Sequence, residues 1–409
     1  MPGIHVAASS HLRLSQPPVY VAAAALSAAL LVLFTRSLVS PSSVSSASSD
    51  RSASKKVLLS PRTTLLPTLS PEEASQLPYP PDVLPGARDV TTPYGSLRVY
   101  EWGPEEGEKV LLVHGISTPS VALAAIAEEL ARRGKRVMLF DLFGRGYSDA
   151  PADLPYDSRL YTTQILLAIT SSPLPWTGAH AQFSIVGYSL GGGVAADFFS
   201  HSPHLVSSLV LLAPAGLIRR SHLSWKSTLL YDNPLLPDRL ALQLIARRLY
   251  TPPSPPTGST SDAASSAAQA EAGQALRRDR RDSMQSHAAP LLPGRPAVTA
   301  AAAVNWQLAH HPGFARAFAS SIRHAPVYAQ HPRWRAIGDR LSAEAAATKK
   351  VLLVLGSADP VVVAEEVRAD AEEALGARNV ETVVVEAGHE LPMSVPGEVV
   401  KAMMGFWGE

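Results

Sequence analysis

Cysteine is missing from this chain of 409 residues. Its absence excludes disulfide bonds, thiolate nucleophiles and every cysteine-ligated zinc or iron–sulfur site, and it leaves the redox state of the compartment open. Charge is also scarce, because charged residues make up 17% of the chain and the formal net charge is +1. Binding of nucleic acid through net positive charge is therefore excluded. The hydrophobic share of 46% indicates that most of the chain folds, as one large core with an inserted or appended part.

Acidic residues are absent from residues 1–49, and residues 19–34 are apolar except for Ser27. At about 1.5 Å per residue, a helix over that apolar run reaches about 24 Å, which is short of the roughly 30 Å hydrocarbon core of a bilayer. Extension of the helix to residue 39 gives the required length if Arg36 places its charge among the lipid headgroups.

We therefore predict an N-terminal tail over residues 1–16 and a transmembrane signal anchor over residues 17–39. A cleaved signal peptide and a mitochondrial presequence are the alternatives. This prediction makes the protein a single-pass membrane protein, with the endoplasmic reticulum favoured over the mitochondrion. Because Arg13 and Arg36 flank the apolar run on its two sides, the distribution of positive charge does not give the orientation.

Residues 40–84 are rich in serine and proline, which predicts a linker between the membrane and a folded domain. Beyond them, short apolar runs predict buried strands over residues 97–102, 109–114, 136–141, 182–187, 208–213, 350–356 and 380–386. Helical periodicity covers residues 121–133, 191–200, 364–375 and 396–407. This alternation predicts an α/β fold with a mostly parallel twisted sheet and helices on both faces. The core is expected to comprise residues 85–215 and 346–409.

The alternation of strands and helices is interrupted over residues 216–345, for which we predict a helical cap. Helical patterns cover residues 240–250 and 297–308, and residues 251–294 lack a hydrophobic period, which predicts a disordered insertion. A basic cluster lies within the insertion, formed by Arg277, Arg278, Arg280 and Arg281. It fits a solvated charged segment, with docking to a membrane surface or an anionic substrate as the alternative.

The strand predicted over residues 182–187 leads into Gly187-Tyr188-Ser189-Leu190-Gly191, and a helical segment follows. This G-x-S-x-G pattern between a strand and a helix is typical of a nucleophile elbow, in which a sharp turn projects the serine above the carboxyl edge of the sheet. The pattern alone also fits a tight turn without chemistry. The strand–turn–helix context favours Ser189 as a nucleophile.

A serine hydroxyl needs a base to take its proton and a carboxylate to orient that base. Asp359 follows the strand predicted over residues 350–356, and His389 follows the strand over residues 380–386. In a doubly wound sheet, the carboxyl ends of such strands share one edge. The chain order Ser189, Asp359, His389 is the order expected after this elbow, and we predict that the three form a catalytic triad. The alternatives are a turn-forming aspartate and a loop histidine that binds backbone groups.

Acyl transfer also needs hydrogen-bond donors for the developing oxyanion. The strand over residues 109–114 leads into Gly115, Ile116 and Ser117, and this loop can aim the Ile116 amide at the same point as the Leu190 amide. We therefore predict an oxyanion hole made by these two backbone amides. An ordinary glycine turn is the alternative. Surface or structural roles are expected for the cap histidines His310, His311, His324 and His331.

These features resemble the α/β-hydrolase fold family, specifically its cap-bearing branch of esterases, lipases and C–C hydrolases. The resemblance is carried by His114-Gly115, Asp141-Leu142-Phe143-Gly144-Arg145-Gly146-Tyr147-Ser148, the Ser189 elbow, Asp359 and His389-Glu390-Leu391-Pro392. It covers about residues 85–409 without the insertion. It implies that Asp141 and Gly144 shape the turn beneath the active site. Branches that open epoxides or displace halide carry an aspartate nucleophile, so the serine implies acyl chemistry.

The resemblance implies a serine hydrolase that cleaves a carboxylic ester through an acyl-enzyme. With the predicted anchor and a hydrophobic cap beside the membrane, we expect a membrane-anchored enzyme that acts on an apolar ester such as a lipid ester. No metal and no organic cofactor is implied, and the expected partners are the ester substrate and the membrane. Two alternatives stay open. The same triad could act on a thioester, an amide or a C–C bond, or the chain could be a catalytically silent, ligand-binding member of the fold.

Overall fold

The computed structural model describes residues 56–178, 181–219, 230–231, 237–252, 287–343 and 351–409. The predicted tail, the predicted anchor over residues 17–39, residues 253–286 of the predicted insertion and its basic cluster lie outside these residues. None of the helices in the described part of the chain combines the length and the apolarity that crossing a membrane requires.

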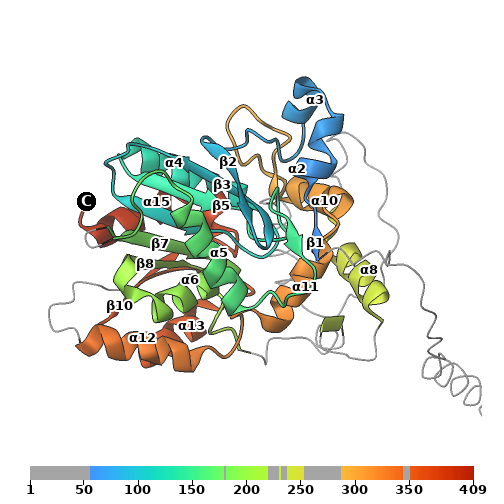
Figure 1. Cartoon of the computed structure of the whole chain (residues 1–409). Coiled ribbons are helices and arrows are strands. Elements are labelled where there is room, and N and C mark those ends of the chain that lie inside the picture. Colours follow the sequence, from blue (N-terminus) through green and yellow to red (C-terminus); the bar gives the residue numbers. More distant parts are fainter. Residues whose placement is uncertain (1–55, 179–180, 220–229, 232–236, 253–286, 344–350) are drawn as a thin grey trace, which may run out of the picture. The chain divides into compact units, whose positions relative to one another are not determined.

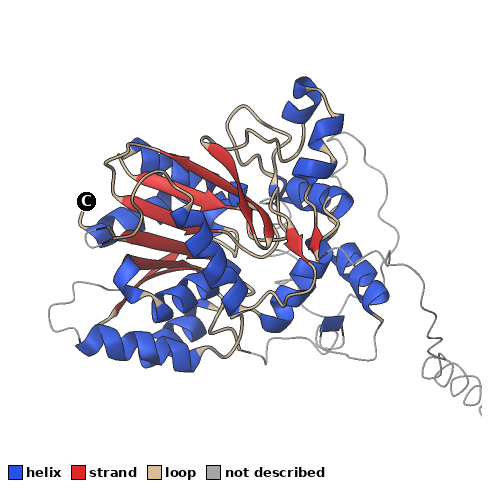
Figure 2. Cartoon of the chain, viewed as in Figure 1, coloured by secondary structure: helices blue, strands red, loops and turns tan. Residues whose placement is uncertain are grey.

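The centre of the folded domain is an eight-stranded sheet with the order β10-β9-β8-β7-β4-β5-β3-β2 (Figures 1 and 2). Its strands are β2 (Ala87–Thr92), β3 (Gly95–Trp102), β4 (Lys109–Val113), β5 (Arg136–Phe140), β7 (Phe183–Tyr188), β8 (Val206–Leu212), β9 (Val351–Gly356) and β10 (Val380–Val385). Strand β3 pairs antiparallel with both β2 and β5, and the other pairings in this sheet are parallel. A separate two-stranded sheet joins β1 (Val57–Leu58) to β6 (Ala150–Pro151).

The inner strands are continuous apolar runs because helices cover both faces of the sheet. Every residue of β9 is buried, for example. At the edge of the sheet, β10 leaves Val384 47% exposed. On one face, α4 (Ala124–Arg132) packs against α15 (Pro396–Trp407), and on the other face α5 (Ser158–Thr170), α6 (Leu190–His201), α12 (His331–Ala343) and α13 (Ala364–Leu375) form a row.

Three further helices, α8 (Asp238–Leu249), α10 (Ala300–His310) and α11 (Phe314–His324), contact one another and form the described part of the cap. Short elements complete the description: α2 (Pro61–Thr64), η1 (Leu66–Thr68), α3 (Pro71–Ser75), η2 (Ser120–Leu123), η3 (Pro203–Leu205) and α14 (Leu391–Ser394). Each predicted strand is present with its ends shifted by at most two residues, and the mostly parallel sheet is confirmed. Strand β2 and helix α5 were not predicted.

The position of helix α12 shows that the cap ends earlier in the chain than the sequence predicted. It lies inside the predicted cap over residues 216–345, yet it packs against the core helices α6 and α13. A Cβ atom on its Gly338 would lie 2.6 Å from the carbonyl oxygen of Leu375, so the two helices touch backbone to backbone. The core therefore resumes at α12 and not at residue 346. The sequence could not reveal this boundary, because the cap was predicted from the absence of strands and no strand lies between the cap helices and α12.

The second half of the predicted linker over residues 40–84 is folded and packed. Two Ser-Pro pairs start helices here, because serine is a favoured N-cap and proline fits the first helical turn: Ser60 precedes α2, and Ser70 caps α3 with a capping box. Tyr79 is fully buried, and its hydroxyl donates a hydrogen bond of 2.8 Å to the carboxylate of Asp141. The serine and proline content of this segment led to the prediction of a linker, whereas these residues in fact begin helices.

Replacing Gly338 with alanine tests whether α12 belongs to the core. We expect Gly338→Ala to lower the free energy of unfolding by about 1–3 kcal/mol, because the new methyl group must push α12 away from α13. The matched control is Gly405→Ala in α15, where the added Cβ would meet no atom within 4 Å. That control should be neutral or stabilising by up to about 1 kcal/mol. Equal unfolding midpoints for both variants in urea would contradict the packing described here.

Candidate active site

Ser189 occupies the sharp turn between strand β7 and helix α6. Its backbone has φ 53° and ψ −118°, a conformation that residues with side chains rarely adopt and that persists only when the surroundings enforce it. Here the surrounding chain enforces it through hydrogen bonds to both the amide and the carbonyl of Ser189. The Ser189 amide donates to the Leu212 carbonyl at 3.0 Å, and the Ala215 amide donates to the Ser189 carbonyl at 2.8 Å. The sharp turn that the sequence predicted is therefore present, and the end of β8 and the residues after it hold it in place.

The two glycines of the G-x-S-x-G pattern are required by close backbone contacts. A Cβ atom on Gly187 would lie 2.3 Å from the Gly191 carbonyl oxygen. A Cβ atom on Gly191 would lie 2.1 Å from the carbonyl oxygen of Val113, the last residue of β4. Any side chain at these positions would force the first turn of α6 away from the sheet.

The structure brings Ser189, His389 and Asp359 together in one line of hydrogen bonds. The Ser189 Oγ atom lies 3.0 Å from His389 Nε2, and His389 Nδ1 lies 2.8 Å from Asp359 Oδ2. These residues are separated by up to 200 positions in the chain. With a proton on Nδ1 that is donated to Asp359, Nε2 is left to accept the proton of the serine hydroxyl.

Asp359 is held by the backbone that follows it. Its side chain is fully buried, and its second oxygen, Oδ1, accepts hydrogen bonds of 2.8 Å from the amides of Val361 and Val362. These donors stabilise the negative charge and leave Oδ2 directed at the imidazole. The turn-forming behaviour that was the alternative interpretation of Asp359 is therefore the means by which its carboxylate is aimed.

The surroundings of His389 favour its protonated form. Burial alone would lower the pKa of His389, but the hydrogen bond to Asp359, the charge of Asp359 and the charge of Glu390 together raise this pKa above its ordinary value. The ring of Tyr188 lies beside the imidazole, with 5.6 Å between the ring centroids. A cation that forms on His389 during proton transfer would thus be stabilised where it forms.

The loop after β4 passes directly beside the serine. A Cβ atom on Gly115 would lie 3.1 Å from the ring of Tyr188 and 3.5 Å from the Cβ atom of Ser189. The amides of Ile116 and Leu190, the two predicted oxyanion donors, have no hydrogen-bond partner among the described residues. Amides that have no other partner are the kind of donor that an oxyanion hole requires.

His114 fixes the direction of the Ile116 amide, a role that the sequence alone did not reveal. Its buried ring donates from Nδ1 to the Gly115 carbonyl at 2.7 Å and accepts at Nε2 from the Leu142 amide at 2.9 Å. Burial lowers the pKa of His114 to about 3, so the ring is neutral. In a trans peptide, the carbonyl of one residue and the amide of the next point in opposite directions. Holding the Gly115 carbonyl therefore turns the Ile116 N–H the other way.

Asp141 is the centre of a buried polar network beneath the site. Its carboxylate accepts hydrogen bonds from the hydroxyls of Tyr79 and Ser120, at 2.8 and 2.7 Å, and from the Tyr147 amide at 2.9 Å. Gly144 follows with φ 75°, in the left-handed region that glycine tolerates. Both residues shape the loop, as the resemblance implied, and neither has a hydrogen bond to the triad in the described structure.

The buried histidine of the cap is also structural. His311 bonds through Nε2 to the Ser148 carbonyl at 2.9 Å and accepts at Nδ1 from the Gly313 amide at 3.1 Å. Burial lowers the pKa of His311 to about 4, so this ring is neutral as well. Among the residues that the structure describes, no cluster of three or more histidine, aspartate and glutamate side chains is arranged to hold a metal ion.

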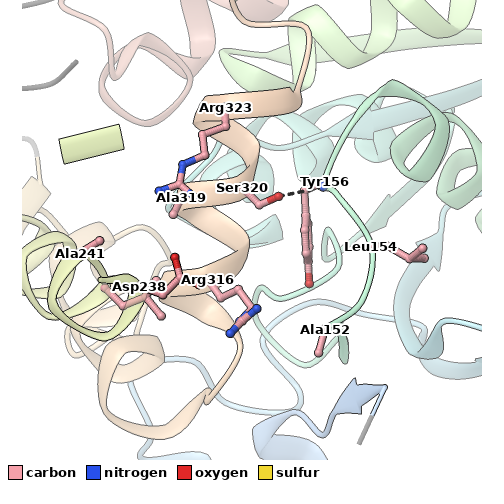
Figure 3. Close-up of a pocket in the computed structure, with 10 residues that line it drawn as sticks. Ala152, Leu154, Tyr156, Asp238, Ala241, Arg316, Ala319, Ser320 and Arg323 are labelled. Carbon is pink, nitrogen blue, oxygen red and sulfur yellow. Dashed lines mark hydrogen bonds between the residues drawn. The ribbon is translucent and has the colours of Figure 1, made fainter. Parts of the chain in front are cut away.

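A cavity of about 120 Å³ lies between α8, α11 and the segment before α5 (Figure 3). Arg316 and Arg323 line it from α11, and Leu154 and Tyr156 line it from the opposite wall. Within the described structure, it is lined by neither the triad nor the two oxyanion amides. We therefore place the candidate active site at Ser189, because the geometry there, and not the size of a cavity, defines the chemistry.

Comparison with known proteins identifies the family. A model of the alpha/beta hydrolase fold family matches residues 109–394, so the chain belongs to this family. A serine hydrolase-like protein of Dictyostelium discoideum is 31% identical over 121 residues, which is 29% of this chain and 32% of that protein. A serine hydrolase-like protein of Danio rerio is 32% identical over 130 residues, covering 32% of this chain and 38% of that protein. The matches thus span about a third of the length of these relatives.

Solved structures agree on the fold. A bacterial membrane phospholipase A superposes with a TM-score of 0.52 at 16% identity, over 95% of this chain and 96% of that one. At this identity, the likeness concerns the fold alone. The family membership and the serine hydrolase-like relatives support a hydrolase.

Titration of His389 tests the electrostatics of the site. We expect its imidazole to titrate with a midpoint above the ordinary 6.5, and we expect the midpoint to fall in Glu390→Gln, since a negative charge that favours the cation is removed. The measurement is a pH series of histidine ring NMR spectra, with the signal assigned by its loss in His389→Gln. The rings of His114 and His311 should not titrate in this range and serve as internal controls. A midpoint at or below 6.5 in the unmodified protein would refute the assignment of charges.

Proposed function

We propose that this protein is a serine hydrolase that cleaves a carboxylic ester through an acyl-enzyme. The observation that carries the proposal is the unbroken chain of hydrogen bonds from Ser189 through His389 to Asp359, at 3.0 and 2.8 Å, on a strained turn in an alpha/beta hydrolase fold. The proposed roles follow from what each atom can give or accept in this geometry.

In the proposed reaction, Ser189 Oγ attacks the carbonyl carbon of the ester while His389 Nε2 takes the hydroxyl proton. The negative charge that develops on the carbonyl oxygen is bound by the amides of Ile116 and Leu190. His389 then returns the proton to the leaving alcohol, and the acyl group stays on Ser189. Water, deprotonated by His389, attacks the acyl-enzyme, and His389 returns this proton to Ser189 Oγ as the acid is released. Asp359 holds the imidazolium in position throughout and does not itself take the proton.

An apolar substrate is supported by what surrounds Ile116. Its side chain packs against the main core and also against a second apolar cluster in the cap, formed by Tyr231, Ile245, Phe318 and Ala319. The residue that would bind the oxyanion therefore also borders an apolar part of the cap. An acyl chain or an apolar alcohol that leaves the carbonyl group on this side would contact carbon and not water. We therefore propose an apolar ester, such as a lipid ester, as the substrate class.

Attachment to a membrane, with the endoplasmic reticulum favoured, stays part of this proposal. It depends on the predicted anchor over residues 17–39, which lies outside the described residues, and its support is the apolar composition of that run. A membrane-anchored hydrolase would meet lipid esters at the surface where they are dissolved, so the proposed location and the proposed substrate class fit each other.

Removal of the Ser189 hydroxyl tests the proposed nucleophile. We expect Ser189→Ala to lose ester hydrolysis by a factor of about 10⁴ or more without unfolding, because the attacking atom is missing. The matched control is Ser200→Ala in helix α6, which follows Ser189; the Ser200 hydroxyl donates only to the Asp197 carbonyl in the described structure. Labelling with a fluorophosphonate probe, which needs an activated serine, should occur in the unmodified protein and in Ser200→Ala and be absent in Ser189→Ala.

A panel of matched ester, thioester and amide substrates then decides the bond type. We expect the ester with the longest apolar chain to give the highest kcat/KM. Hydrolysis that survives in folded Ser189→Ala, or an unmodified protein that neither reacts with the probe nor turns over any member of the panel, would overturn the proposal.

A further inference from the structure

Three successive carbonyls of the loop beside Ser189 are each bound by a side chain from a different part of the fold. His114 binds the Gly115 carbonyl, as described above. The next carbonyl, of Ile116, accepts a hydrogen bond of 3.0 Å from Arg145 Nε. The third, of Ser117, accepts a bond of 3.0 Å from Gln307 Nε2. The proposed oxyanion loop is thus fastened along its whole length.

Gln307 reaches this loop from the cap helix α10. Its side chain is fully buried. While Nε2 donates to the Ser117 carbonyl, Oε1 accepts a hydrogen bond of 2.9 Å from the amide of Gly146. One amide group therefore connects the cap to two loops of the core at once, and it uses its donor and its acceptor to do so.

Arg145 makes the second connection, to the cap helix α11. Its guanidinium is fully buried and donates to the Ile116 and Phe143 carbonyls at 3.0 Å and to Ser321 Oγ at 2.9 Å. The Ser321 hydroxyl donates its own proton to the Ala317 carbonyl at 2.6 Å, so its oxygen is turned to accept from the arginine. Each of these acceptors is a neutral oxygen. Among the described residues, Arg145 has no carboxylate partner, and the Tyr156 ring lies 5.9 Å from its Cζ atom. Burying a guanidinium in this way is costly, which points to a specific task for this side chain.

We propose that Arg145 and Gln307 are positioning residues for the oxyanion hole: through them, the cap helices α10 and α11 hold the two peptides that follow the Ile116 amide, while His114 holds the peptide that carries this amide. The inference rests on the proposed function. Oxyanion donors stabilise a transition state only when they already point at the place where charge develops. A loop of three residues with free carbonyls could rotate its peptide planes, whereas bonds to successive carbonyls hold each plane. In this arrangement, the cap is part of the catalytic framework and not merely a cover.

Variants of the full chain separate this role from general stabilisation. Gln307→Met keeps the volume and removes the bonds to Ser117 and Gly146. Arg145→Lys keeps the charge but cannot span the separate acceptors. Ser321→Ala removes the contact from α11 to Arg145 together with a bond to the Tyr161 hydroxyl. The matched control is Asn305→Ala in α10, which also loses two backbone hydrogen bonds, both to Thr251 and away from the loop. For each protein, kcat and KM are measured on a short activated ester, together with the rate of fluorophosphonate labelling and the melting temperature.

We expect kcat and the labelling rate to fall together by about 10- to 100-fold in Gln307→Met and Arg145→Lys, with KM changed by less than about threefold, because only the transition state uses the oxyanion donors. Ser321→Ala should show the same pattern with a smaller loss, and Asn305→Ala should keep the unmodified kcat. If Arg145→Lys does not fold, Gln307→Met and Ser321→Ala decide the question.

Variants that melt earlier but keep the unmodified kcat and labelling rate would overturn the positioning role and leave the proposed function standing. A loss of kcat in Asn305→Ala equal to that in Gln307→Met would overturn it too. An unmodified protein that the probe does not label would instead overturn the proposed function, and the positioning role with it.

Discussion

The close approach of backbone to backbone at the carboxyl edge of the sheet is the constraint on which the rest of the site depends. At Gly191, the first turn of α6 lies against the end of β4, which brings the Ser189 hydroxyl, the Leu190 amide and the loop after β4 into one small space. A second close approach occurs at Gly356, where a Cβ atom would lie 2.5 Å from the carbonyl oxygens of Ala387 and Gly388. That contact joins the loops that carry Asp359 and His389. Both contacts exclude side chains, so the positions of the triad are set by the main chain.

The cap and the core meet through buried polar side chains rather than through apolar contact alone. Gln307 and Arg145 place donors on partly buried carbonyls of the loop beside Ser189. The same bonds therefore satisfy the backbone, attach the cap and orient the loop. These combined roles explain why the fully buried side chains of Arg145 and Gln307 are found so near the proposed reaction centre. It also distinguishes α10 and α11, which carry Gln307 and Ser321, from α12, which packs against the core helices α6 and α13.

The sequence predicted the fold and the meeting of Ser189, His389 and Asp359 because both follow from local patterns. Buried strands are continuous apolar runs, and each triad residue lies directly after such a run. The contributions of Arg145 and Gln307 could not be predicted in this way, because their partners are backbone carbonyls, and any residue supplies a carbonyl. The role of His114 had a weak signal, its position directly before Gly115 at the end of a strand. The packing of Tyr79 could not be predicted either. A segment rich in serine and proline can begin helices or stay extended, and its composition does not distinguish the two.

The N-terminal segment before the sheet has a consequence for the limits of the catalytic unit. Tyr79 supplies one of the donors to Asp141, and the Ser60 amide donates to Asp149 at 2.7 Å, so both ends of the loop from Asp141 to Asp149 are held by residues that precede the first strand of the large sheet. A segment transferred from this chain to another protein, by recombination or by design, would need to start before Ser60 to bring that loop with its partners. The smallest segment that carries this loop with its partners therefore begins before Ser60, and not at β2, the first strand of the large sheet.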